Sequence, residues 1–560
     1  MDLILTRLVE AGRLASADVA QLREQAAESS EPLPALLAKS GLMTPAGFAR
    51  AMADLYNVEI ASGDALPKEL LFPGQLAARF LEANRALPIR QDERTVWLGM
   101  ADPTDSATMR AVAIATRRRV IPVVVPHDEL ERAIVKAVRA DAPSLDEIGR
   151  AAAGGDPLDQ MPDDKESLEH QAEAAPVIRF VNQMLSDAAR TSASDIHVEP
   201  ARDRLRVRFR VHGRLREIGA PPARLAAAVI SRIKIMARLD IAERRLPQDG
   251  RARVVVDQRR FDLRVATAPS VHGESVVIRL LETDKDAPSF VELGMPTAIE
   301  AAIRRQLAAP HGMFLVTGPT GSGKTTTLYT SLRQLDAVSD KIISIEDPVE
   351  YQVEGVTQIQ VRPEIDLGFA RILRSVVRHD PDVIMVGETR DGETADIAVN
   401  AALTGHLLLS TLHTNSAAGA IGRLLDMGVE PFLLASVLRG VLGQRLVAEL
   451  CPNCRRPHPP TEEEAAVLRR FGGEDLPVTL FAADGCEQCN GTGIVGRVGI
   501  FEMLEVDEEI RRLIRERAPS QALQAHAMTR GMTTMFQDGV AKARAGITTL
   551  DEVLRATEEF

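Results

Sequence analysis

The chain has 560 residues, of which 45% are hydrophobic and 26% charged, and its formal net charge at pH 7 is −12. This length predicts three or four domains rather than one core, and the negative charge disfavours a general nucleic-acid binder, which would carry a basic surface. No apolar run approaches the roughly 18 residues of a membrane-spanning helix, and Met1–Arg7 lacks the basic segment and cleavage site of a secretory signal. We therefore expect a cytoplasmic protein that contacts a membrane only through protein partners.

The first 140 residues predict an N-terminal α/β domain, residues 1–140. Residues 1–60 alternate amphipathic helical segments with Pro and Gly breakers. Two β-branched runs follow, Thr95–Met100 and Val120–Val125, with a helical segment at Ser106–Ala115 between them. This order is a βαβ-like pattern.

Residues 141–175 change in character, because they are polar, acidic and rich in turn formers such as Gly154-Gly155-Asp156-Pro157. We predict a flexible linker here. Such a linker would let the N-terminal domain reorient against the rest of the chain.

A second α/β domain is predicted at residues 176–284. In Leu205–Val211 apolar residues alternate with arginines, which predicts a strand with one basic face. The chain then turns at His212-Gly213 and returns as a hairpin. The basic face is a candidate for neutralising phosphate, and the alternative is a set of paired surface charges. The other predicted elements are helices at Pro176–Thr191 and Ala223–Arg238 and strands at Arg253–Val256, Phe261–Ala266 and Ser275–Leu281.

From Gly318 to Thr325 the chain reads Gly-Pro-Thr-Gly-Ser-Gly-Lys-Thr, between an apolar strand, Met313–Thr317, and a helix, Lys324–Leu335. Glycines let the backbone curl so that its N–H groups face phosphate oxygens, and the helix N-terminus adds partial positive charge. Lys324 would reach the β- and γ-phosphates, and the Thr325 hydroxyl would bind Mg²⁺. The predicted nucleotide-binding residues are Gly318, Pro319, Thr320, Gly321, Ser322, Gly323, Lys324, Thr325 and Thr326.

The domain around this loop, residues 285–447, contains four short apolar runs of the kind that strands buried on both faces show. They predict a parallel, doubly wound sheet with ligands at the carboxyl ends of its strands. The runs are Phe314–Val316, Ile342–Ile345, Val383–Val386 and Leu407–Ser410.

Two acidic residues follow these strands. Glu388 occupies the place of a Walker B acid, with Gly387 where an Asp is usual, so Mg²⁺ would be held mainly through water. Glu346 is the other candidate for polarising water. The alternative for both is a carboxylate exposed at the edge of the sheet.

Hydrolysis also needs positive charge at the γ-phosphate. Arg374 and Arg378 are spaced i,i+4, which predicts one helix face. Arg251, Arg264 and Arg279 belong to the preceding domain, and they would act as arginine fingers if that domain closes over the nucleotide. Each of the five could instead be a solvated surface residue.

Two histidines, His406 and His413, flank the strand at Leu407–Ser410. They lack a third ligand that would suggest a metal site. Hydrogen-bonding sensors near the nucleotide fit better, with His413 the stronger candidate, and core or edge histidines are the alternative.

The only four cysteines form two CxxC pairs, Cys451/Cys454 and Cys486/Cys489, which offer four thiolates to a tetrahedral Zn²⁺. Disulfides are disfavoured in the cytosol. The spacer could hold a helix at Glu462–Arg470. We expect a structural zinc module at residues 448–500, without an open coordination position for catalysis, followed by a helical region at residues 501–560.

With these residues assembled, the chain resembles the ATPases of bacterial secretion and pilus assembly, and most closely the type II secretion ATPases. The resemblance is strong from about residue 176 onward and less specific before it. It rests on the phosphate loop, the four cysteines and five further segments: Ile345–Glu350, which resembles the family's Asp box; Leu373–Val383, running into Gly387-Glu388; the His box Thr404–Asn415; Ser194–Pro200; and Gly546–Val553.

The resemblance implies a RecA-like ATPase core in a hexameric ring that binds ATP, Mg²⁺ and, in its cysteine module, Zn²⁺. It implies that Glu388 is the Walker B acid and that Glu346 belongs to the catalytic set. It also implies phosphate-binding roles for a set of arginines, namely Arg264, Arg279, Arg374, Arg378 and, less firmly, Arg251.

The implied function is a cytoplasmic motor, peripheral to the inner membrane, that powers type II secretion by driving pseudopilus assembly. Its partners would be the cytoplasmic domain of an inner-membrane platform protein, bound by the N-terminal domain, and a polytopic platform protein, with no nucleic acid. The alternatives are a type IV pilus extension ATPase and, from another class, a P-loop small-molecule phosphotransferase. Some pilus extension ATPases bind cyclic di-GMP through repeated Arg-Leu-Gly-type motifs; Gly12-Arg13-Leu14 has no such repeat, which disfavours that ligand.

Overall fold

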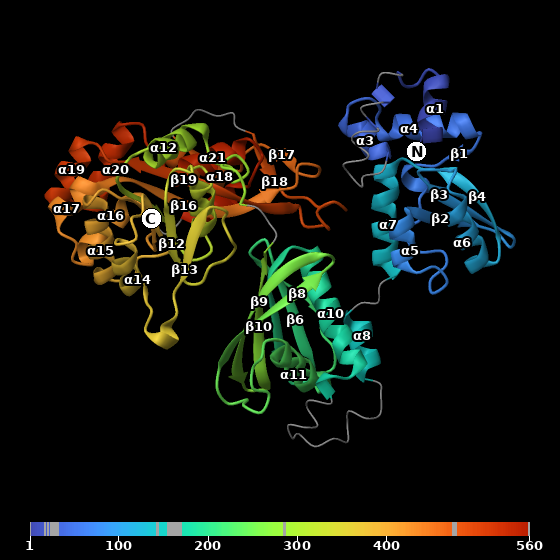
Figure 1. Ribbon diagram of the computed structural model, residues 1–560, viewed down its shortest axis with the longest axis horizontal. Helices are drawn as coiled ribbons and strands as arrows, with labels where there is room; N and C mark the ends of the chain where they lie inside the picture. Colours follow the sequence, from blue (N-terminus) through green and yellow to red (C-terminus); the bar gives the residue numbers. More distant parts are fainter. Residues whose placement is uncertain are drawn as a thin grey trace. The chain divides into compact units, whose positions relative to one another are not determined.

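The chain is known from a computed structural model that describes residues 2–15, 18–19, 22, 33–141, 145–153, 171–283, 287–472 and 479–557. It divides into two compact units, Met1–Ser144 and Leu145–Phe560 (Figure 1). Within the described ranges no helix combines the length and hydrophobicity that crossing a bilayer requires.

The first unit begins with helices packed around their own apolar core, which includes Leu5, Leu8, Phe48 and Met52. The third of them starts sharply because Thr44 accepts a hydrogen bond from the backbone N–H of Gly47 at 3.1 Å, a standard N-cap. The helices are α1 (Asp2–Glu10), α3 (Leu33–Lys39) and α4 (Pro45–Tyr56).

A four-stranded sheet in the order β1-β4-β3-β2 follows these helices, and its β3–β4 pair is parallel. The expected βαβ pattern is therefore present, with its helix between two parallel neighbours. The elements are β1 (Glu59–Ile60), η1 (Gly63–Ala65), α5 (Ala78–Asn84), β2 (Ala86–Gln91), β3 (Thr95–Met100), α6 (Ser106–Thr116), β4 (Arg119–Val124) and α7 (His127–Asp141).

The segment expected as a linker differs in part from that expectation. Its residues 145–153 form a helix, α8 (Leu145–Ala153), which belongs to the second unit. Leu145 is buried in the core of that unit, and the Asp146 carboxylate accepts the backbone N–H of Ala220 at 2.6 Å. The segment therefore forms a packed helix through the apolar face of α8, although its acidic composition suggested a linker. Residues 142–144 and 154–170 of the expected linker lie outside the described residues.

The second unit contains an antiparallel six-stranded sheet in the order β7-β6-β5-β10-β9-β8, and two helices, α10 and α11, contribute to its apolar core. The expected hairpin is confirmed as β6–β7. Its basic face is ion-paired, since Arg206 lies 3.3 Å from Glu217 and Arg208 lies 2.7 Å from Glu199. The elements are α10 (Ala175–Arg190), β5 (Ala193–Pro200), β6 (Leu205–Val211), β7 (Arg214–Gly219), η2 (Ala223–Leu225), α11 (Ala226–Met236), β8 (Gln248–Val256), β9 (Arg259–Ser270) and β10 (Gly273–Glu282).

The second sheet of this unit has seven strands in the order β13-β12-β14-β15-β11-β16-β19, and all but β19 run parallel. Alternate residues of β11 belong to two different apolar cores. Met313 and Leu315 belong to one core, and Phe314 and Val316 belong to the other. Helices cover both faces of the sheet, which explains the continuous apolar runs.

The expected strands are β11 (Gly312–Thr317), β12 (Ile342–Glu346), β14 (Val383–Val386) and β15 (Leu407–Leu412), so the parallel doubly wound sheet is confirmed. The remaining elements up to the insertion are α12 (Thr297–Leu307), α13 (Lys324–Leu332), β13 (Val356–Gln360), η3 (Pro363–Ile365), α14 (Phe369–Val376), α15 (Gly392–Leu403), α16 (Ala417–Asp426), α17 (Pro431–Val437) and β16 (Leu438–Leu450).

Three strands of this sheet, β13, β16 and β19 (Ile494–Glu505), were not predicted from the sequence. β19 crosses the expected start of the helical region at residue 501 and pairs antiparallel with β16. The segment with the cysteines is an insertion between these neighbours. It holds β17 (Arg456–His458), α18 (Glu462–Gly472), which confirms the expected helix, and β18 (Leu480–Ala482); the chain ends in α19 (Glu508–Arg515), α20 (Ser520–Thr529), α21 (Met535–Arg544) and α22 (Leu550–Thr557).

Candidate nucleotide and metal sites

The glycine-rich loop connects β11 to α13, as the sequence predicts. Gly318, Gly321 and Gly323 have φ angles of 155°, 80° and 86°, which an L side chain rarely adopts. A Cβ on Gly318 would also lie 2.3 Å from the backbone oxygen of Gln444. Only glycine allows the loop to close this tightly.

The polar groups of the loop are arranged for an anion. The Lys324 ammonium is buried and donates hydrogen bonds to the backbone oxygens of Gly318 and Pro319 at 2.8 and 3.0 Å. Burial lowers the pKa of Lys324 to about 8, although nearby Glu388 favours its charged form. The buried hydroxyl of Ser322 has no hydrogen-bond partner within the described residues. A lysine and an unused hydroxyl at a helix N-terminus fit the phosphates of ATP and, with Thr325, its Mg²⁺.

Gln444 on β16 braces this loop, a role that the sequence does not predict. Its amide donates to the backbone oxygen of Ser322 at 2.8 Å, and its carbonyl accepts the hydroxyl of Thr327 at 2.6 Å. Gln444 is 1% exposed. A glutamine in a strand this apolar is the only sequence signal for the contact.

A pair of threonines joins the loop to the His box. The hydroxyls of Thr317 and Thr414 lie 2.6 Å apart, and the backbone N–H of Thr414 donates to Thr317 at 3.0 Å. The carboxyl ends of β11 and β15 are therefore tied together beside the phosphate loop.

Glu346 is the last residue of β12 and is 2% exposed. Its carboxylate accepts hydrogen bonds from Tyr329, from Ser344 at 2.5 Å and from Gln358 at 3.0 Å. The alternative of an exposed edge carboxylate is wrong for Glu346. Tyr329 and Gln358 were not predicted.

Glu388 follows β14 and lies close enough to Lys324 to act on its charge. It forms an ion pair with Arg390, and its Oε2 lies 3.4 Å from the Nε2 of His413. Hydrogen bonding to Glu388 raises the pKa of Arg390. Arg390 is a further cation at this site that the sequence reasoning missed.

The other histidine does not belong to this site. His406 precedes the amino end of β15, where its backbone oxygen accepts the N–H of Gly312, the first residue of β11. Its Nδ1 lies 2.8 Å from the backbone oxygen of Ala401. The phosphate loop follows the carboxyl end of β11, whereas His406 lies at the amino end of the parallel strand β15. The predicted sensor role for His406 is therefore wrong.

Arg374 and Arg378, the two candidate arginines within the predicted ATPase domain, do not share a helix face. α14 ends at Val376, so Arg378 lies in the turn beyond it. Asp380, with φ of 56°, and Pro381 end the helix early. Arg374 is on the helix and forms an exposed ion pair with Glu393.

The three arginines of the preceding domain stand in one cross-strand row. Arg251 on β8 is opposite Arg264 on β9, which is opposite Arg279 on β10. Like charges directly opposite each other are destabilising. Nε and Nη2 of Arg264 are buried without a hydrogen-bond partner within the described residues, and burial lowers its pKa while Glu350 opposes the shift. Arg279 is paired with Asp195 at 3.0 Å.

Arg251, at one end of the row, lines a cleft of about 1040 Å³ whose other wall includes the segment Val349–Glu354 after β12. Burial raises the pKa of Glu350, and Arg264 and Arg279 act against that shift. The buried nitrogens of Arg264, which lack hydrogen-bond partners among the described residues, are suited to an anion.

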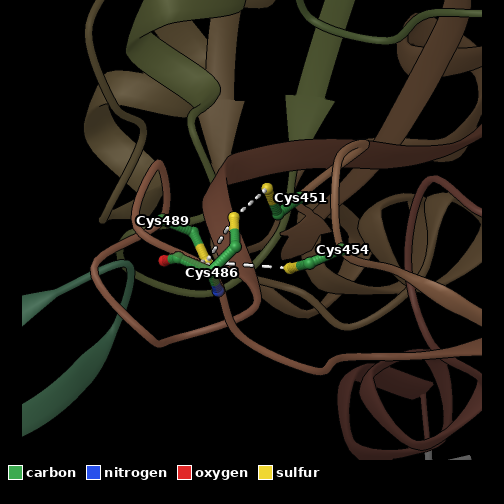
Figure 2. Close-up of side chains that lie close together, drawn as sticks. All are labelled: Cys451, Cys454, Cys486 and Cys489. Atoms are coloured by element: carbon green, nitrogen blue, oxygen red, sulfur yellow. Dashed lines mark hydrogen bonds between the residues drawn. The ribbon is translucent and has the colours of Figure 1, made fainter. Parts of the chain in front are cut away.

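The four cysteines converge at the base of the insertion (Figure 2). The sulfur atoms of Cys451 and Cys486, and those of Cys454 and Cys489, are 3.8 Å apart, and all four lie within 4.8 Å of one another. A tetrahedron with Zn–S bonds of about 2.3 Å has sulfur atoms about 3.8 Å apart, whereas a disulfide needs about 2.05 Å. The spacing fits a metal.

The backbone supports the thiolate form of Cys489. Although burial raises its pKa, the N–H groups of Cys486 and Gly493, at 3.2 and 3.1 Å from its sulfur, lower the pKa of Cys489 to about 6. Thiolates are the form that binds metal.

The parallel sheet, the glycine-rich loop after β11 and the carboxylates after β12 and β14 define a P-loop nucleotide-binding protein with a RecA-like core. Residues 170–555 match the model of the family described as Type II/IV secretion system protein, and residues 56–143 match the MshEN domain. The chain belongs to the Type II/IV secretion system protein family, which confirms the resemblance to secretion ATPases.

Several relatives are similar over most of their length. The Type II secretion system protein E of Xanthomonas campestris pv. campestris is 45% identical over 99% of this chain and 98% of its own. The Type II secretion system ATPase E of Vibrio cholerae is 48% identical over 72% of this chain and 79% of its own. The structure of the Legionella pneumophila ATPase DotB covers 68% of this chain and 96% of its own, with a TM-score of 0.50 and 23% identity, and supports the fold alone.

Proposed function

We propose that this chain is an ATP-hydrolysing motor that powers type II secretion by driving pseudopilus assembly at the inner membrane. One observation carries the proposal: a complete phosphate loop with carboxylates at the ends of β12 and β14 lies in a chain whose similarity to Type II secretion system protein E extends over 99% of its length.

In this proposal the loop binds the triphosphate. Lys324 exchanges the two carbonyl oxygens it now contacts for β- and γ-phosphate oxygens, and Ser322 donates its unused hydroxyl. Thr325 and, through water, Glu388 would hold Mg²⁺, which neutralises charge on the transferred group. Glu346 polarises the attacking water.

The arginine row supplies the remaining positive charge. Arg251 lines the cleft beside the segment after β12, Arg264 is opposite Arg251 on the next strand, and both Arg264 and Arg279 act on the charge of Glu350 in that segment. Bringing this row to the γ-phosphate would require movement of the six-stranded sheet, and that movement is how hydrolysis would perform work. Arg374 and Arg378 are weaker candidates for the same task, because they lie on either side of the end of α14.

The four cysteines would hold a structural Zn²⁺. All four positions of a tetrahedral ion are filled by protein, so none is open for catalysis. The ion would close the base of the insertion between β16 and β19, where the backbone N–H of Cys451 donates to the backbone oxygen of Gly493.

The motor would work as a ring of six copies, as the resemblance to the secretion ATPases implies. The N-terminal unit would attach this ring to the cytoplasmic domain of an inner-membrane platform protein, and a polytopic platform protein would receive the movement. Whole-length similarity to protein E relatives supports this arrangement.

Two measurements test the proposal. Purified protein with Mg²⁺-ATP should release phosphate without any acceptor substrate; a phosphorylated small-molecule product and no phosphate release would favour a phosphotransferase instead. Deletion in the native host should abolish export of secreted proteins and leave type IV pili intact. Lost pili with normal export would favour pilus extension.

A further inference from the structure

Tyr329 connects the phosphate-loop helix to the acidic segment after β12. It lies on α13 with Lys324 and is completely buried. Its hydroxyl donates to Oε2 of Glu346 and accepts the backbone N–H of Glu350 at 3.2 Å. Its ring packs edge-on against Tyr351, with ring centroids 4.5 Å apart. One side chain therefore contacts both ends of the segment from residue 346 to residue 350.

The hydrogen bonds around Glu346 leave little freedom for its carboxylate. A carboxylate has about four acceptor positions. Oε1 accepts from Ser344 at 2.5 Å and from Gln358 at 3.0 Å, which fills that oxygen. Oε2 accepts from Tyr329 alone among the described side chains. The single remaining position is on Oε2, and its direction is set by the bond to Tyr329.

We propose that Tyr329 is a positioning residue for ATP hydrolysis, which aims the remaining lone pair of Glu346 Oε2 at the attacking water. In that step the water oxygen bonds to the γ-phosphorus, and the bond from the γ-phosphorus to the β–γ bridging oxygen breaks. ADP leaves with the bridging oxygen, and the water proton passes through Glu346 to the released phosphate. The inference rests on the proposed function, in which Glu346 polarises this water.

The position of Tyr329 on α13 adds a coupling to nucleotide binding. Any shift of the helix that carries Lys324 also moves the hydroxyl that orients Glu346. The hydroxyl keeps its proton, because burial and the adjacent Glu346 raise the pKa of Tyr329. It therefore stays a donor to the carboxylate throughout the working pH range.

The first test is Tyr329→Phe in the full-length protein, which removes the hydroxyl and keeps the ring against Tyr351. We expect kcat, measured well below the melting transition, to fall about tenfold or more, the typical effect of losing a hydrogen bond to a charged group, while KM for Mg²⁺-ATP stays unchanged. The melting temperature should fall, because the buried Glu346 carboxylate and the N–H of Glu350 each lose a partner. Tyr351→Phe is the matched control: it removes a hydroxyl from the same ring pair, leaves the three donors of Glu346 in place and should retain kcat. A raised KM with unchanged kcat in Tyr329→Phe would overturn the inference.

The second test separates action through Glu346 from a general effect on packing. Glu346→Gln removes the charged acceptor, so adding Tyr329→Phe to it should slow turnover no further. Independent, multiplying losses would mean that Tyr329 does not act through Glu346. Wild-type protein that hydrolyses no ATP would reject the proposed function, whereas an active wild type with an equally active Tyr329→Phe variant would reject only the role of Tyr329.

Discussion

At the scale of one residue, Lys324 shows that the loop is preorganised to bind phosphate. Its ammonium is buried, and only two backbone oxygens, those of Gly318 and Pro319, are its hydrogen-bond acceptors among the described residues. Burial lowers the pKa of Lys324, and both of these acceptor oxygens are neutral carbonyl oxygens. A bound triphosphate would supply the full negative charge that is missing.

We predict that Lys324→Ala abolishes ATP turnover and leaves the fold intact. The ammonium is needed at the γ-phosphate, but no carboxylate depends on it for an ion pair within 4.0 Å among the described residues. Phosphate release and thermal melting check the prediction. Lys68→Ala, which removes an exposed lysine of the first unit, is the control. Near wild-type turnover in Lys324→Ala would contradict the role of this lysine.

Single residues differ in how well sequence patterns predict their roles. Glu346 and Glu388 were predicted because they follow apolar runs, and both lie where the strands end. Tyr329 was not, because nothing in the helix sequence Lys-Thr-Thr-Thr-Leu-Tyr-Thr-Ser-Leu indicates that this hydroxyl contacts a carboxylate on the next strand, 17 residues further along the chain. Arg390 was missed because it lies two residues past the acid it pairs with.

Elements buried on both faces were predicted best. β12 and β14 agree with their predicted ranges to within one residue, since every position in them is buried. β16 was missed because Gly440 and Gly443 weaken a strand pattern. The structure gives their reason: a Cβ on either would lie 2.7 Å from a side-chain atom of β19, in Met503 or Glu502.

The short helix α8 was read as linker because residues 141–175 as a whole are polar, acidic and rich in turn formers, and α8 itself contains a glycine, Gly149. In the structure that glycine is a close-packing position, since a Cβ there would lie 2.4 Å from the ring of Pro221. Packing against another element is information that local composition does not contain.

The insertion between β16 and β19 gives a prediction at the scale of elements. Cys451 directly follows β16, and its partner Cys486 comes from the other end of the insertion. Because a bound Zn²⁺ would fix this closure, Cys451→Ser should lose zinc and cost the C-terminal region at least about 3 kcal/mol of unfolding free energy. Metal analysis and urea unfolding measure both effects.

The control for this variant is Asn453→Ala, which changes the loop between Cys451 and Cys454 and keeps all four thiolates. It should retain zinc. Wild-type protein that contains no zinc and melts at the same temperature with and without a chelator would reject a structural metal.

At the scale of the whole molecule, the arginine row is a local conflict that is only partly compensated: Arg279 is paired with Asp195, whereas Nε and Nη2 of Arg264 are buried without a hydrogen-bond partner among the described residues. Arg251, Arg264 and Arg279 are adjacent on one sheet, although Arg208 on the same sheet is paired with Glu199 at 2.7 Å. A sheet selected for stability alone would also pair or remove the charge of Arg264. Conflicts of this kind are expected at functional sites, and the cleft beside the row is where an anion would relieve it.

This reasoning predicts that stability and activity move in opposite directions in Arg264→Met. Methionine removes two buried, unpartnered donor nitrogens and one like charge from the row, so the free energy of unfolding should rise by about 1 kcal/mol. Turnover should fall at least about tenfold, because the arginine no longer reaches the γ-phosphate. Arg208→Met is the matched control on β6: it should keep turnover and gain no stability, since it breaks the ion pair between Arg208 and Glu199. A variant Arg264→Met that is less stable than the wild type and fully active would mean that the row has only a structural role. The proposed movement of the six-stranded sheet toward the nucleotide would then have no physical basis.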